Sequence, residues 1–105
     1  MCALSTDKVG ADIQREQAIS DNMTKRVYTE KELEQADSLS LWCLKECFIK
    51  LNGKIDRTYR EMEFLKSDNA FCGPNGIWGA VIDEIDGYKA AVCAENAGNV
   101  IVSLL

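Results

Sequence analysis

Four of the five cysteines have the residue type and spacing to suggest metal chemistry. Cys43 and Cys47 are four residues apart, so a helix would place both thiols on one face. With Cys72 and Cys93 they could surround a zinc ion as four thiolates. Structural zinc sites usually present closely spaced cysteine pairs, whereas Cys72 and Cys93 are single and far apart. We therefore expect Cys43, Cys47 and Cys93 to pack in the core as small hydrophobic residues, and we predict no metal site.

Cys72 is the best candidate for a reactive thiol, because the loop of residues 71–76 is expected to be exposed. A nucleophilic cysteine needs a base, a cation or a helix N-terminus that lowers its pKa. The chain contains no histidine, which excludes Ser-His-Asp and Cys-His catalysis within one chain. Only Lys or Arg could activate Cys72, so thiol catalysis is not our leading hypothesis.

A cluster of acidic residues, Asp83, Glu84 and Asp86, surrounds a possible turn at Gly87. Aligning Gly87 with the invariant glycine of a calcium loop places residues without carboxylates at the first and last ligand positions, which excludes calcium. No Gly-rich phosphate loop is present either. The sequence does not exclude acid–base chemistry by carboxylates from distant parts of the chain that the fold brings together. The sequence predicts no cofactor and assigns no catalytic residue, so we favour a protein that is not an enzyme.

The composition indicates a small acidic globular protein. Its 105 residues fit one domain, and its net charge of −5 argues against a nucleic-acid binder, which needs a basic face. No apolar run approaches the about 18 residues of a membrane-spanning helix, and we recognise no signal peptide, so we predict a cytoplasmic protein that binds no membrane. We expect residues 1–28 to be a polar, weakly structured segment, mobile or loosely docked, and residues 29–105 to form a single α+β domain.

Two helices are expected in the first part of that domain. Thr29 and Glu32 match a capping box, and Asn52-Gly53 is typical of a helix end, so the first helix should cover residues 30–52. Apolar residues at helical spacing predict a second helix over residues 55–66. Alternatively, Asn52-Gly53 forms a hairpin turn between two strands.

The last third of the chain predicts a three-stranded antiparallel sheet, on which the two helices would pack. Its strands are expected at residues 77–85, 88–95 and 99–105. Asp86-Gly87 between apolar runs favours a two-residue hairpin turn, which would place Ile82 opposite Ala91. Alternatively, residues 88–97 form an Ala-rich helix.

Trp42 and Ile49 give the first helix a second apolar face. At about 100° per residue they fall nearly opposite the main apolar stripe. Another part of the chain or a second molecule must cover them, because large exposed apolar patches usually mark contact sites. The apolar terminal strand Val100–Leu105 could also pair with its copy in a second subunit. Both features favour a homodimer.

The sequence therefore favours a small protein-interaction module of accessory, inhibitor or immunity type, which acts by binding a protein partner or itself. The predicted partner-binding residues are Trp42, Ile49, Trp78, Asp83, Glu84 and Asp86. Aromatic residues would anchor the interface, and the acidic residues would steer a basic partner. The alternative is a small-molecule-binding or thiol-dependent enzyme with a pocket between the helices and the sheet.

Overall fold

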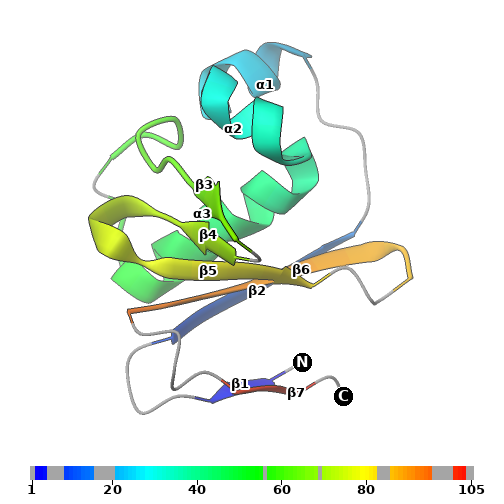
Figure 1. Cartoon of the computed structure of the whole chain (residues 1–105), viewed down its shortest axis with the longest axis vertical. Coiled ribbons are helices and arrows are strands. Elements are labelled where there is room, and N and C mark those ends of the chain that lie inside the picture. Colours follow the sequence, from blue (N-terminus) through cyan, green and yellow to red (C-terminus); the bar gives the residue numbers. More distant parts are fainter. Residues whose placement is uncertain are drawn as a thin grey trace.

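A computed structural model describes residues 2–4, 9–15, 21–55, 57–68, 70–82, 86–95 and 101–103 (Figure 1). Within these residues, five antiparallel strands form one sheet in the order β2-β6-β5-β4-β3. The strands are β2 (Val9–Arg15), β3 (Leu65–Ser67), β4 (Ala70–Cys72), β5 (Trp78–Ile82) and β6 (Tyr88–Ala94). A short 3₁₀ turn, η1 (Pro74–Gly76), connects β4 to β5.

The longest helix, α3 (Ser38–Asn52), lies across one face of this sheet and packs on β2, β5 and β6. Two shorter helices, α1 (Asp21–Val27) and α2 (Glu30–Gln35), precede it and lie beyond one end of the sheet in Figure 1. β1 (Cys2–Leu4) and β7 (Ile101–Ser103) pair with each other in a separate two-stranded sheet. The fold is therefore mixed α+β, but the predicted arrangement of two helices on a three-stranded sheet is wrong.

The predicted helix over residues 30–52 is two helices in the structure. Its start is confirmed, because Thr29 and Glu32 form the capping box through both reciprocal hydrogen bonds, of 3.2 and 2.9 Å. α2 ends after one and a half turns, since Asp37 accepts hydrogen bonds from the Ser40 amide at 3.0 Å and the Ser40 hydroxyl at 2.7 Å. This second cap starts α3 afresh. The predicted stop is confirmed at Gly53, whose φ of 81° is left-handed.

The predicted helix over residues 55–66 is absent from the structure, which describes all of these residues except 56. Residues 58–62 form a turn instead, and the chain continues into β3, which pairs with β4. The buried Lys45 ammonium group on α3 donates to the carbonyl groups of Tyr59 and Met62 at 2.8 Å each. These carbonyl groups therefore point towards α3 and do not form a regular helix. Apolar spacing alone could not reveal this competing use of the backbone.

The N-terminal segment supplies a full strand to the main sheet, which contradicts the prediction of a mobile or loosely docked segment. β2 pairs with β6 along its whole length, from Val9 opposite Ala94 to Arg15 opposite Tyr88. The predicted third strand at residues 99–105 takes no place beside β6. Its described part, β7, pairs with β1.

The hairpin between β5 and β6 turns at Asp86-Gly87, where Gly87 has a φ of 78°, but its predicted register is wrong by one residue. Ile82 lies opposite Ala90, not Ala91. Packing against α3 explains the shift, since Gly79 lies opposite Cys93 and both face the helix. A Cβ at Gly79 would lie only 2.8 Å from the Leu44 side chain. A one-residue slip would turn larger side chains towards α3.

The core lies between α3 and the sheet, and it includes the three cysteines that were expected to be buried. Cys43 and Cys93 have no exposed surface, and neither has Cys47. Their thiols donate to backbone carbonyl groups, so they are satisfied as core residues. Among the described residues, no helix has the length and apolar character needed to cross a membrane.

Candidate functional site

An ion pair between α3 and β2 is the centre of the candidate site. The Lys50 ammonium nitrogen lies 2.8 Å from Asp12 Oδ1. The Asp12 side chain is 6% exposed, whereas that of Lys50 is 55% exposed, so the pair opens to solvent on the lysine side. An edge strand of the sheet thus contributes a nearly buried carboxylate, and the last turn of α3 contributes an exposed cation.

Gly10 brings β2 close enough to α3 for this pair to form. A Cβ at Gly10 would clash with the Cys47 carbonyl oxygen and would lie 2.9 Å from the Leu51 amide nitrogen. Only glycine allows this approach. Because side chains alternate along a strand, Asp12 points to the same face as Gly10 and reaches α3, while Ile13 points to the opposite face and is 48% exposed.

Both oxygens of the Asp12 carboxylate have partners. Oδ1 accepts from Lys50, and Oδ2 accepts from the Gln14 side-chain amide at 2.9 Å. The hydrogen bond with Asp12 raises the pKa of Lys50, and the charges of Asp12 and Glu46 add to this effect against partial burial. Lys50 therefore remains a cation at neutral pH.

Glu46 lies one turn before Lys50 on the same face of α3. Its Oε1 accepts a hydrogen bond of 3.0 Å from the Tyr59 hydroxyl. The Tyr59 ring stacks on Trp42, one further turn back, with 5.0 Å between ring centroids. One face of α3 thus presents an aromatic, an acidic and a basic side chain at successive turns, and the last of these, Lys50, binds the carboxylate of Asp12 on β2.

This arrangement fits a divalent cation and a phosphate group. Mg²⁺ prefers oxygen ligands and is usually bound by one or two carboxylates together with substrate phosphates and water. Asp12 and Glu46 are carboxylates of this kind. Lys50, which lies 2.8 Å from Asp12 and one turn after Glu46 on α3, is a point charge suited to a phosphate oxygen. The described residues contain no cluster of three or more metal-ligating side chains. Two carboxylates would leave the other positions around a bound Mg²⁺ to water and phosphate oxygens.

Comparison with known protein families identifies the superfamily of the chain. Residues 8–93 match the model of the 4′-phosphopantetheinyl transferase superfamily. The chain belongs to this superfamily. The match covers most of the chain and includes both β2 and α3, with all three charged residues of the site. A search of curated proteins found no match.

Membership of a transferase superfamily overturns the prediction of a protein-interaction module. The thiol-dependent alternative does not describe this site either. Its charged groups are two carboxylates and an ammonium group, and exposed Cys72 lies on β4, which β5 and β6 separate from β2. The predicted role as an inhibitor or protein-binding protein is wrong for the same reason.

The structure places the predicted partner-binding residues in different regions. Trp42 belongs to the site face of α3 and is half-buried, and Ile49 is half-buried against the core. Trp78 is half-buried on β5, and Asp86 is exposed in the hairpin turn. Asp83 and Glu84 lie outside the described residues. No observation tests whether these six residues bind a partner or whether the protein forms a homodimer, so both stay predictions.

Sequence reasoning missed Asp12 as a site residue and assigned no chemistry to Glu46 and Lys50. Two signals were available. An aspartate follows glycine within the apolar run Val9–Ile13, where a strand would bury it. Glu46 and Lys50 form an i,i+4 pair in a part of α3 whose only other charged residue is Lys45. These signals indicate a site only when β2 lies beside α3. We expected the N-terminal segment to be weakly structured, so the sequence did not suggest this contact.

Proposed function

We propose that the protein is a 4′-phosphopantetheinyl transferase whose active site is formed by Asp12, Glu46 and Lys50. The observation that carries the proposal is the Asp12–Lys50 ion pair beside Glu46, within a chain that belongs to this superfamily. The group is joined through a phosphate, so its transfer is a phosphoryl-type transfer. Such reactions depend on positioning and on charge placed around the phosphate oxygens.

Asp12 and Glu46 are the residues that would hold a divalent cation. A bound Mg²⁺ supplies positive charge to the phosphate oxygens and helps to orient them. Gln14 holds one oxygen of Asp12 at 2.9 Å, which limits the rotation of that carboxylate. The negative carboxylates alone would repel a phosphate group, and a divalent cation between them would remove this repulsion.

Lys50 is the protein's own positive charge in the site, in addition to the divalent cation. Its exposed side chain is fixed at one end by Asp12, so the ammonium group is oriented before a substrate binds. In the transfer, an acceptor oxygen forms a bond to phosphorus, and the bond from phosphorus to the donor oxygen breaks. The donor oxygen leaves as a phosphate on the rest of the donor molecule, and the proton of the acceptor hydroxyl passes to water. Lys50 binds the phosphate and stabilises the charge on its oxygens.

Transfer from coenzyme A tests the proposal, with apo acyl carrier protein as a probe acceptor. The intact mass of the acceptor should increase by one phosphopantetheinyl group when the wild-type protein and Mg²⁺ are present. Asp12→Asn should reduce the rate at least about 100-fold, since it removes a charged ligand and the partner of Lys50. Glu34→Gln, at an exposed position of α2, is the control and should transfer at the wild-type rate. Equal rates for wild type and Asp12→Asn would contradict the proposed site.

A further inference from the structure

Tyr59 contacts α3 in three ways, although it belongs to the turn that follows this helix. Its hydroxyl group donates to Glu46 at 3.0 Å, and its ring stacks on Trp42 at 5.0 Å. Its backbone carbonyl accepts from the Lys45 ammonium group at 2.8 Å. Neighbouring residues of α3 therefore hold the backbone and the hydroxyl end of the same tyrosine.

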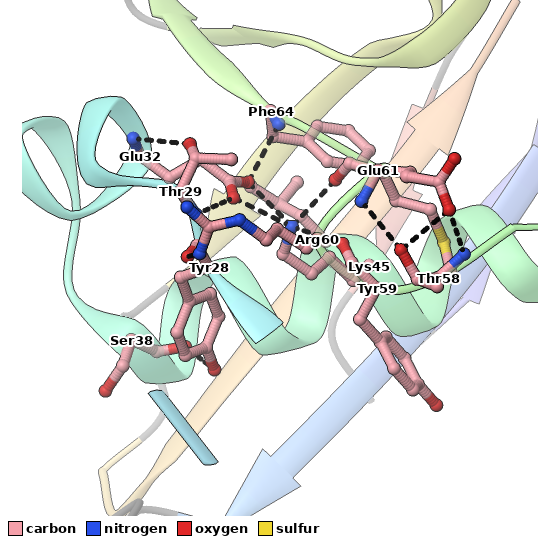
Figure 2. A network of polar contacts seen from close by, with 12 residues as sticks. Tyr28, Thr29, Glu32, Ser38, Lys45, Thr58, Tyr59, Arg60, Glu61 and Phe64 are labelled. Carbon is pink, nitrogen blue, oxygen red and sulfur yellow. Dashed lines mark hydrogen bonds and ion pairs between the residues drawn. The ribbon is translucent and has the colours of Figure 1, made fainter. Parts of the chain in front are cut away.

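The Lys45 ammonium group is the anchor of this arrangement (Figure 2). Its three acceptors are the carbonyl groups of Tyr59 and Met62 and the carboxylate of Glu32, each at 2.8 Å. Lysine has three N–H donors, so all of them are used. Neither Lys45 nor Glu32 has any exposed side-chain surface. The remaining capacity of Glu32 is taken by the backbone amides of Thr29 and Phe64, at 2.9 Å each.

Two further contacts fix the turn that carries Tyr59. The Glu61 carboxylate accepts from the Thr58 amide at 3.0 Å and from its hydroxyl at 2.8 Å. The Arg60 guanidinium group donates to the carbonyl oxygen of Tyr28 at 2.6 Å, which ties the turn to the end of α1. Figure 2 shows these contacts on either side of Tyr59, whose ring projects away from the cluster. The turn is thus a rigid support for one projecting side chain.

The geometry points to Tyr59 as a positioning residue that selects one orientation of the Glu46 carboxylate. A half-exposed glutamate on a helix otherwise samples several rotamers, and a ligand that needs one of them must pay this entropy when it binds. A hydrogen bond from a rigid phenol fixes the carboxylate in advance. This inference rests on the proposed function, because Glu46 is assigned there as a ligand of the divalent cation.

Tyr59→Phe tests the inference, since it keeps the ring and its stacking on Trp42 but removes the hydroxyl group. Mn²⁺ is a suitable probe, because binding to the intact protein can be followed from the electron paramagnetic resonance of free Mn²⁺ without any transfer. Loss of a hydrogen bond to a metal ligand typically weakens metal affinity about tenfold or more. We expect this loss for Tyr59→Phe. Tyr88→Phe, at the exposed first residue of β6, is the matched control and should bind Mn²⁺ as the wild type does.

A kinetic experiment separates positioning from a merely structural role. With Tyr59→Phe, the Mg²⁺ concentration that gives half-maximal transfer should increase about tenfold, while the rate at saturating Mg²⁺ changes much less. A structural defect would instead lower the melting temperature and the maximal rate together.

Unchanged Mn²⁺ affinity and unchanged Mg²⁺ dependence would overturn the inference, and transfer by the wild type would then leave the proposed function intact. No Mn²⁺ binding by the wild-type protein would also overturn it. Weakened Mn²⁺ binding without transfer by the wild type would support the positioning role and contradict the proposed function.

Discussion

Lys45 and Lys50 lie on the same helix, and each ammonium group lies 2.8 Å from a carboxylate, but their surroundings differ. The Lys45–Glu32 pair has no exposed side-chain surface, and every donor and acceptor in it has a protein partner. The Lys50–Asp12 pair is buried only on the aspartate side. The first pair joins α2, α3 and the turn at residues 58–62, whereas the second faces solvent beside Glu46.

The pKa shifts of the two lysines have opposite signs. Burial lowers the pKa of Lys45, and the hydrogen bond and charge of Glu32 offset this only in part. The hydrogen bond with Asp12 raises the pKa of Lys50 above its ordinary value. A lysine in a closed, saturated network has no donor left for a ligand, so its role is structural. A lysine in a half-open pair keeps a charged group available for substrate.

Breaking the buried pair should have the largest effect on stability. Lys45→Met would leave the Glu32 carboxylate buried without a counter-charge and would remove the contacts to Tyr59 and Met62. We expect a loss of about 3–5 kcal/mol in the free energy of unfolding, measured by urea denaturation. The double variant Lys45→Met/Glu32→Gln should recover part of the loss, because it removes the uncompensated charge. A loss below about 1 kcal/mol for Lys45→Met would contradict the assigned role.

Gly10→Ala should disturb the open pair without touching the buried one. The added methyl group would meet the backbone of Cys47 and Leu51, which cannot move aside as a side chain can. Overpacking of this kind costs about 1–3 kcal/mol, and separation of β2 from α3 should also weaken transfer. Calorimetry and the transfer assay measure the two effects. Gly87→Ala is a useful comparison, because nothing lies near its Cβ position and only its positive φ is strained. It should lower stability but leave transfer by the folded protein unchanged.

The N-cap of α3 should have a smaller effect. Asp37→Ala removes the hydrogen bonds with Ser40 and should cost about 1 kcal/mol in the free energy of unfolding. Partial burial raises the pKa of Asp37, but the hydrogen bonds from Ser40 and the charge of Lys89 more than offset this, so the folded-state pKa lies below the ordinary 3.8.

A carboxylate whose pKa is lowered by folding stabilises the protein above its unfolded-state pKa, and this contribution is lost as the pH falls through the folded-state pKa. The stability difference between the wild type and Asp37→Asn should therefore be constant near neutral pH and shrink below about pH 4. Urea denaturation at a series of pH values would measure it. A difference that grows on acidification would show that the sign is wrong.

Lys50→Met should have the smallest effect on stability. Lys50 is 55% exposed, so water can take its place beside Asp12 when the ammonium group is removed. We expect a change of no more than about 1 kcal/mol in the free energy of unfolding. A loss as large as that of Lys45→Met would remove the distinction between the two pairs.

Local signals in the sequence predicted the local structure. The capping box at Thr29 and the helix end at Gly53 depend on neighbouring residues, and both are present. Asp86-Gly87 does lie in a turn, but the register of β5 and β6 excludes the predicted two-residue hairpin turn. The role of β2 depends on a partner strand about eighty residues away along the chain, and only the sheet reveals it. Its Gly10 and Asp12 reduce intrinsic strand preference, so the segment did not look like a strand.

The candidate site follows the same division. Glu46 and Lys50 are neighbours on a helix, and their spacing was visible in the sequence, but the helix alone gives them no function. Asp12 joins them only through the close approach that Gly10 permits. Lys45 could not be told from Lys50 by sequence, because its partners come from α2 and from a turn that was predicted to be a helix.

The most direct test of the account compares phosphopantetheinyl transfer by Lys50→Met and by the wild type, at a temperature where both are folded. The intact mass of an apo acyl carrier protein, incubated with coenzyme A and Mg²⁺, reports the transfer. The account predicts a mass gain with the wild type and a rate at least about 100-fold lower with Lys50→Met, although its stability is nearly unchanged. Transfer by Lys50→Met at the wild-type rate, or no transfer by the wild type, would contradict the assignment of the open pair as the active site.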